Sequence, residues 1–180
     1  MTGPTRNTSP GFALALHGGA GTLRRGLMDE ARGPLYRAGL KASLAAGHDV
    51  LGAGGSALDA VSAAVLMLED DPLFNAGRGA SFTSSGTIEM DAAVMEGRER
   101  RAGAVAGIFG PKNPVLAARA VMEHSPHVLL AGEGAVAFCR GQGLAFAERD
   151  YFYTENRWQA LQHILERRRR GLPDTDPRRG

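Results

Sequence analysis

The stretch SALDAVSAAVLMLEDDP (Ser56–Pro72) marks the clearest element of this 180-residue chain. Ser56 precedes Asp59 by three residues, the spacing at which a side-chain oxygen caps the first turn of a helix. Apolar residues then recur at helical intervals, and the proline that follows cannot continue a helix. The stretch therefore predicts a helix from Ser56 to about Glu69, and the other elements are placed outward from it.

The flanking segments predict strands and further helices. Upstream lie a short buried strand over Phe12–Leu16 and a helix over 35–51, which the glycines of GAGG end. Downstream, antiparallel strands with turns at 84–86 and 96–98 are predicted by the alternation of Ile88, Met90, Ala92 and Val94 with Thr87, Glu89, Asp91 and Ala93. Asn113 as the N-cap and Pro114 as the first residue predict a helix over 113–124. Further helices are predicted from about Glu133, after a short extended piece, and over 155–170. Helices before and after a mainly antiparallel sheet define the α+β class.

Composition is that of a globular chain of one domain. The mass is 18.9 kDa, with 43% apolar and 22% charged residues. Its single cysteine, Cys139, excludes an intrachain disulfide, nothing near Met1 resembles a signal peptide, and no apolar run approaches about 20 residues. We therefore expect a cytoplasmic protein with no membrane partner. RRRR at Arg167–Arg170, followed by Gly171 as a stop, indicates a solvated helix end rather than a nucleic-acid site, because no aromatic platform accompanies it.

Two segments are candidates for a functional site. HGGAGT (His17–Thr22) is a glycine-rich turn after a strand, but it matches neither nucleotide-binding pattern, so a tight turn with a core histidine is the simpler interpretation. LEDDPLFNAGRGASF (Leu68–Phe82) combines three consecutive acids, which lack the spacing of an EF-hand, with a lone amide, Asn75, among apolar residues and glycines. Asn75 is therefore either a clamp on its own loop or a group aimed at a substrate.

No nucleophile stands out. Asp91 falls on the polar face of a predicted strand, where a solvated or turn-binding acid is the usual case. Cys139 lies in the apolar helical stretch VAFCR and is interpreted as a packing residue. The chain contains neither G-x-S-x-G nor H-E-x-x-H, so the chemistry is incomplete as it stands.

Several segments in order resemble the α-subunit of plant-type asparaginases, also called isoaspartyl peptidases, which are N-terminal nucleophile hydrolases. The resemblance is carried by HGGAGT, GGSALDAVSAAVLMLEDDPLFNAGRGASFT, EMDAAVMEG, AGAVAGI and NPVLAARAVMEHSPHVLL. It covers His17 to about Gly134 and becomes loose from about Leu144.

The resemblance implies an αββα sandwich to which this chain contributes one half. Members of the family are made as one precursor that cuts itself before a threonine, so the threonine nucleophile would follow Gly180 on a separate β-subunit. A heterotetramer of two α- and two β-subunits, (αβ)2, acting on L-asparagine or β-aspartyl peptides is implied as well. Residues 1–11 would be a disordered leader, 12–143 the α-subunit core, and 144–180 a helical segment and linker that ends at the cleavage site.

The resemblance also assigns residues. Asn75 matches the asparagine beside the nucleophile, and the glycine-rich turn near the cleavage site matches His17, Gly18, Gly19 and Gly21. No organic cofactor is implied. A structural sodium ion would be held by the backbone carbonyls of Leu68, Glu69, Asp71, Phe74, Ala76 and Arg78. Arg78 departs from the small or apolar residue of the family, which matters little because the ligand is a carbonyl.

Two alternatives remain open. A glycosylasparaginase or a taspase-like protease shares the self-cutting threonine; the lack of a signal peptide and of paired cysteines disfavours the first, and the compact length disfavours the second. A non-catalytic binding domain is a different class. A threonine codon directly after Gly180 would support the enzyme, and a stop codon would support the binding domain.

Overall fold

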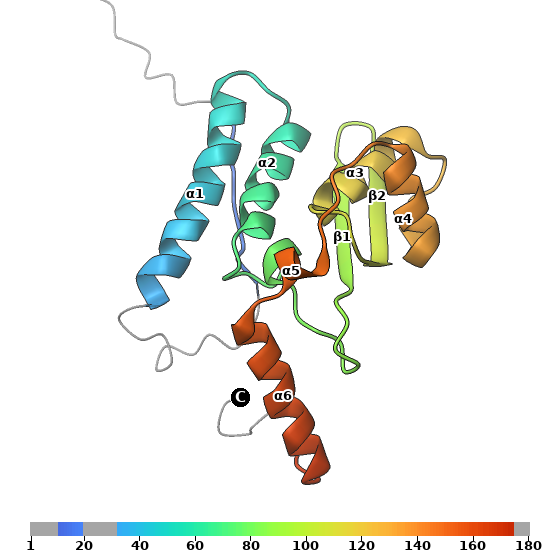
Figure 1. Cartoon of the computed structure of the whole chain (residues 1–180). Helices are drawn as coiled ribbons and strands as arrows, with labels where there is room; N and C mark the ends of the chain where they lie inside the picture. Colours follow the sequence, from blue (N-terminus) through green and yellow to red (C-terminus); the bar gives the residue numbers. More distant parts are fainter. Residues whose placement is uncertain (1–10, 20–31, 175–180) are drawn as a thin grey trace, which may run out of the picture.

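The computed structural model describes residues 11–19 and 32–174 and has an α+β fold (Figure 1). Two antiparallel helices, α1 (Arg32–Gly52) and α2 (Ala57–Asp70), pack side by side next to a small sheet. Small residues permit their close approach: Ser43 is fully buried and its Oγ donates a 2.6 Å hydrogen bond to the Ala64 carbonyl. A Cβ on Gly47 would lie 2.8 Å from the Ala60 carbonyl oxygen. This helix pair supports the loop that follows α2.

The sheet has the order β1-β2-β3. Strands β1 (Met90–Glu96) and β2 (Arg101–Ile108) are antiparallel, with a register shift between Met90 and Ala92. The short strand β3 (Leu129–Ala131) pairs parallel with β2. Buried Met90 and Val94 alternate with exposed neighbours along β1, as the period of a strand with one covered face requires. The predicted alternation is therefore confirmed.

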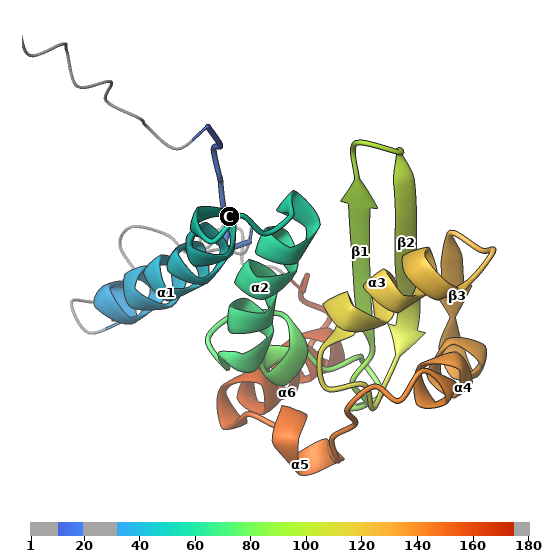
Figure 2. The ribbon, with the colours of Figure 1, turned by 90° about the horizontal axis from the view of Figure 1, so that it is seen from above.

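Helix α3 (Pro114–His124) covers the sheet (Figure 2). Gly103 on β2 allows this contact, because a Cβ there would collide with the Ala118 carbonyl and the Met122 amide nitrogen. Helix α4 (Gly132–Gly141) follows β3 and buries Cys139, the packing role predicted for it. The core around these elements is apolar and includes Val105, Ile108, Ala117, Val121 and Phe152.

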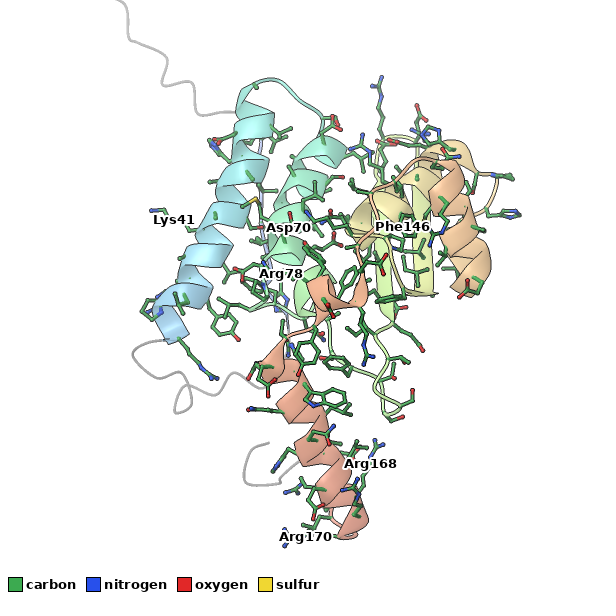
Figure 3. The ribbon with its side chains drawn as sticks, viewed as in Figure 1. Lys41, Asp70, Arg78, Phe146, Arg168 and Arg170 are labelled. Atoms are coloured by element: carbon green, nitrogen blue, oxygen red, sulfur yellow. The ribbon has the colours of Figure 1, made fainter. Side chains whose placement is uncertain are left out.

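The C-terminal part consists of α5 (Arg149–Phe152) and α6 (Glu155–Arg169), and α6 extends away from the sheet (Figure 1). Trp158 on α6 makes an edge contact with Phe82, which fastens the helix to the segment after α2. The arginine run, with Arg168 and Arg170 labelled in Figure 3, ends α6 as predicted. Arg168 pairs with Asp174 at 2.6 Å, and Gly171 has a φ of 64°.

The helices at 35–51, 56–69, 113–124, from 133 and at 155–170 are confirmed, whereas α5 was not predicted. The predicted strand at Phe12–Leu16 is wrong: these residues alternate between partly buried and exposed but have no strand partner in the described chain. A strand exists only where a neighbour accepts its backbone hydrogen bonds, and pattern alone does not supply that neighbour. Gly11 is the one residue of the predicted leader that the structure describes.

None of the helices in residues 11–19 and 32–174 is long and apolar enough to span a membrane.

Candidate functional site

The loop after α2 is tightly folded on its own backbone. Asp71 starts it by accepting the Leu73 amide hydrogen at 3.0 Å on Oδ1. A single 3₁₀ turn, η1 (Gly77–Gly79), closes it. A Cβ on Gly79 would collide with the carbonyl oxygens of Phe74 and Pro72, and one on Gly77 would collide with that of Glu69. Only glycine fits at these two positions, so the sequence GRG is a geometric requirement of the loop.

Phe74 anchors the loop to the helix pair. Its side chain is buried and meets the Tyr36 ring of α1 edge-on at a centroid distance of 5.7 Å. Gly39 of α1 makes room for it, since a Cβ there would lie 2.8 Å from the Phe74 ring. Gly18 packs against the same ring, since a Cβ on Gly18 would lie 3.3 Å from a carbon of the Phe74 ring. The structure thus brings the two candidate segments together at Phe74.

Asn75 is exposed, in contrast to the burial expected from its apolar neighbours. Its Oδ1 accepts a 2.8 Å hydrogen bond from the Ser81 amide, which spans η1. Asn75 therefore does clamp its own loop. Among the residues that the structure describes, the side-chain nitrogen of Asn75 has no hydrogen-bond partner, so the donor half of the amide is available to a ligand.

Glu69, on the last turn of α2, is buried, and its Oε1 accepts a 2.9 Å hydrogen bond from the Val115 amide. This carboxylate therefore caps the start of α3, the role that the sequence had suggested for Asn113, whose own side chain does not cap the helix. Burial raises the pKa of Glu69 to about 7, against the opposing effect of the hydrogen bond from Val115. Its Oε2 is buried without a partner within the described chain.

The neighbouring Asp70 points to other partners. Its Oδ1 accepts hydrogen bonds from the Tyr151 hydroxyl at 3.0 Å and the Asn113 amide at 3.1 Å, and Lys112 lies 3.5 Å away. Burial alone would raise the pKa of Asp70, but these hydrogen bonds and the lysine charge lower it. Arg78, labelled beside Asp70 in Figure 3, and Lys112 each lie over the Tyr151 ring. The carboxylates at 69–71 thus bind separate partners, and these side chains do not converge on one ion.

A pocket of about 200 Å³ opens beside Asn75, between the loop, the start of β1 and the start of α3. Its lining consists of Glu69, Asn75, Ala76, Gly77, Ala80, Glu89, Met90, Asp91 and Pro114. Asp91 is held by the Gly107 amide, which donates to its Oδ1 at 2.7 Å across the strands. The pocket is therefore acidic on one wall and carries an unpaired amide donor on the other.

The other predicted site residues are placed as follows. His17 is exposed rather than in the core, and its Nδ1 accepts the Gly19 amide hydrogen at 3.2 Å. Gly21 and Gly180 lie outside the described residues. Leu68 is buried, Ala76 is half-buried and Arg78 is exposed. No group of three acidic, histidine or cysteine side chains in the described chain could hold a metal ion, so any ion here would need backbone ligands.

Two residues that contact the loop after α2 or the end of that helix were not predicted from the sequence. Tyr151 reaches Asp70 across 81 positions, and the Arg157 Nε donates to the Gly79 carbonyl across 78 positions at 2.8 Å. Contacts between such distant residues leave no local pattern, although Thr154 does cap α6 three residues before Arg157 in the usual way.

Comparison with known proteins identifies the family. A sequence profile of the asparaginase family matches residues 10–178. The chain is 49% identical over 148 residues to an isoaspartyl peptidase of Salmonella typhimurium and 51% identical over 155 residues to a plant-type L-asparaginase of Pyrococcus furiosus. It is also 46% identical to a putative isoaspartyl peptidase/L-asparaginase of Dictyostelium discoideum. The chain belongs to the asparaginase family.

The alignments cover the two proteins unequally. They include 82% of this chain and 47% of the Salmonella protein, and 85% and 48% for the Pyrococcus protein. For the Dictyostelium protein the shares are 82% and 43%. The chain spans about half the length of the curated relatives it matches.

Proposed function

We propose that this chain is the α-subunit half of a self-cleaving threonine amidohydrolase that hydrolyses L-asparagine, β-aspartyl peptides or both. The observation that carries the proposal is Asn75: its oxygen is held by Ser81, and its nitrogen has no partner in the described chain beside an open pocket. The names of the relatives, isoaspartyl peptidase and L-asparaginase, support the reaction class. These relatives are about twice as long as the part that aligns with this chain, which supports a second half of the enzyme.

In this proposal the precursor cuts itself after Gly180. The hydroxyl of the next threonine adds to the Gly180 carbonyl, the amide becomes an ester, and water hydrolyses the ester to a carboxylate and a free threonine. The freed hydroxyl then attacks the substrate amide, and the threonine α-amine, whose reference pKa is about 8, takes up the proton. The leaving group is ammonia or an amino acid, and water then hydrolyses the aspartyl ester left on the threonine and releases aspartate. The two halves would form the αββα sandwich and the (αβ)2 assembly in the cytoplasm.

The contribution of this chain is to hold a donor in place. An amide whose oxygen is already bonded has lost its freedom to flip, so its N–H groups keep one direction. Aimed at the threonine hydroxyl or at the oxygen on which charge develops, such a donor stabilises the transition state. The rigid η1 turn and the buried Phe74 supply the support that this orientation needs.

A structural sodium ion is proposed at the backbone carbonyls of Leu68, Glu69, Asp71, Phe74, Ala76 and Arg78. Leu68 and Glu69 lie in the last turn of α2, where carbonyls have no partner within the helix. The close approach of Gly77 to the Glu69 carbonyl bends the loop around this helix end. Hard carbonyl oxygens suit an alkali ion, which would order the loop and take no part in the reaction.

The test uses substitutions in the full-length precursor that separate the two halves of the Asn75 amide. Asn75→Asp keeps an acceptor for the Ser81 amide but loses the free donor, whereas Asn75→Ala loses both. We expect both variants to self-cleave slowly and to lose about 10²–10³ in kcat on L-asparagine and β-aspartyl dipeptides, because one positioned donor has this effect. Self-cleavage half-life, kcat and melting temperature are measured on the same preparations.

Asn113→Ala is the matched control, since this amide is bonded to Asp70 and lies outside the pocket. It should keep kcat within a factor of about two while losing some stability. Normal self-cleavage and kcat in Asn75→Asp would leave Asn75 as a loop clamp only. A wild-type precursor that neither cleaves nor hydrolyses these substrates would refute the proposed function.

A further inference from the structure

The side chain of Arg157 connects two regions that the sequence keeps apart. It starts on the first turn of α6, is half-buried, and places its Nε 2.8 Å from the carbonyl oxygen of Gly79 at the end of η1. A half-buried guanidinium is costly unless its donors are used, so this contact is specific rather than incidental.

The bond acts on one peptide group from both sides. The carbonyl of the Gly79–Ala80 peptide accepts from Arg157, and its N–H donates to the Gly77 carbonyl at 3.1 Å. With both polar ends bonded, the plane of this peptide cannot rotate. The next N–H along the chain belongs to Ser81 and is the one that holds the Asn75 oxygen. The peptide that Arg157 holds is thus adjacent to the peptide whose N–H orients Asn75.

The backbone that carries Arg157 is itself fixed. Thr154 caps α6 by accepting the Arg157 amide hydrogen at 3.4 Å, and Trp158 packs on Phe82 at a ring distance of 5.3 Å. Leu161, one turn further along, is buried. The guanidinium therefore starts from a rigid position, which is what an orienting group needs.

We propose that Arg157 is a positioning residue for Asn75: by fixing the Gly79–Ala80 peptide, it aligns the free amide donor of Asn75 with the reacting groups. The inference rests on the proposed function and adds a residue from the helix that leads into the C-terminal linker. This role of Arg157 makes the geometry of the Asn75 loop depend on the docking of α6. Loosening this docking would slow self-cleavage and turnover without changing any group that touches the substrate.

Arg149 offers a matched control. It also donates from the C-terminal part of the chain to a glycine carbonyl, with Nη2 3.2 Å from Gly86. Gly86 lies in the turn between Thr83 and Thr87, which makes no hydrogen bond to Asn75 within the described chain. Arg149→Gln removes the same kind of bond outside the path from Arg157 to Asn75.

The experiment is a double-mutant cycle in the full-length precursor. Arg157→Gln is made in the wild-type and the Asn75→Ala backgrounds, and Arg157→Lys and Arg149→Gln in the wild-type background. Self-cleavage half-life, kcat, KM and melting temperature are measured with L-asparagine and a β-aspartyl dipeptide. We expect Arg157→Gln to lower kcat about tenfold in the wild-type background and less than about twofold in Asn75→Ala, because a residue that acts through Asn75 has nothing left to align.

Arg157→Lys, which keeps the charge but not the planar fork, should recover part of kcat and serves as the readout if Arg157→Gln does not fold. Arg149→Gln should keep wild-type kcat. Equal losses of kcat from Arg157→Gln in both backgrounds, or a lower melting temperature with wild-type kcat in both Arg157 variants, would overturn the inference. A wild-type protein with no activity would instead overturn the proposed function, and this inference with it.

Discussion

The two ends of helix α2 are built on different principles. At the first end, Ser56 accepts the Asp59 amide hydrogen at 3.0 Å, and Arg119 of α3 pairs with the Asp59 carboxylate at 2.7 Å, all near the surface. At the other end, the Glu69 carboxylate is buried, and Gly77 and Gly79 press against backbone carbonyls with no space for a Cβ. The first end is stabilised by a cap within its own turn and by one partly exposed ion pair, and the other end by buried contacts with distant parts of the chain.

The difference separates a solvated helix end from a packed one that supports the candidate site. A capped, solvated helix start tolerates change, because water replaces a lost bond. The packed helix end does not, and it supports the Asn75 loop, the Tyr151 contact and the Arg157 bond. The pocket opens at this end and not at the other. Substitutions at the two ends should therefore differ in size and in kind.

The largest difference is expected between two glycines. In the full-length protein, Gly79→Ala should lower the free energy of unfolding by about 3 kcal/mol or more, since the new Cβ meets backbone oxygens that cannot move aside. Gly54, in the turn before α2, has a φ of 82° and no atom within 4 Å of a built Cβ. Gly54→Ala should cost only about 1 kcal/mol of backbone strain. Denaturant unfolding of both variants measures this, and equal losses would contradict a rigid loop.

An effect of intermediate size is expected when the proposed sodium ion is replaced. If sodium binds the carbonyls around Glu69, replacing it with tetramethylammonium at equal ionic strength should lower the melting temperature of the full-length protein by several degrees. A ligand at about 100 times its Kd adds about 2.7 kcal/mol to stability. The Asp59→Asn variant should keep the whole shift, because the ion would bind at the opposite end of the helix. Identical melting temperatures in the two salts would remove the sodium site.

The smallest effect is expected at Asp59. Hydrogen bonds from Ser56 and Arg119 lower the pKa of Asp59 below its ordinary value of 3.8. A lowered pKa in the folded state contributes stability above pH 3.8, and that stability is lost as the pH falls through the folded value. Since the pair is partly exposed, Asp59→Asn should cost about 0.5–1 kcal/mol at pH 7 in the full-length protein, and less in acid.

Asp49→Asn is the control for this measurement, because its side chain is 84% exposed and it should change stability by less than about 0.5 kcal/mol. Denaturant unfolding at pH 7 and at decreasing pH compares the two variants. A loss at Asp59 that does not diminish in acid would show that the carboxylate charge is not its source.

Local rules were enough for most of the elements. The capping pair at Ser56 and Asp59, the alternation along β1 and the stop at Gly171 each involve residues within a few positions, so their physics is contained in the sequence. The motifs shared with known proteins likewise predicted the family, which the comparisons confirm, whereas the role of Asn75 stays a prediction. The glycines of the loop after α2 also belong to these motifs, although the sequence does not show which backbone atoms they approach.

Only the tertiary structure decided which distant groups meet. The capping of α3 by Glu69 instead of Asn113, the contact of Gly18 with Phe74 and the bond from Arg157 to Gly79 join residues far apart in the chain. The same holds for the failure of Phe12–Leu16 to form a strand, which depends on a pairing partner and not on its own residues. Hydrogen bonds and packing between distant segments depend on how the whole backbone folds, and a local pattern carries no record of that.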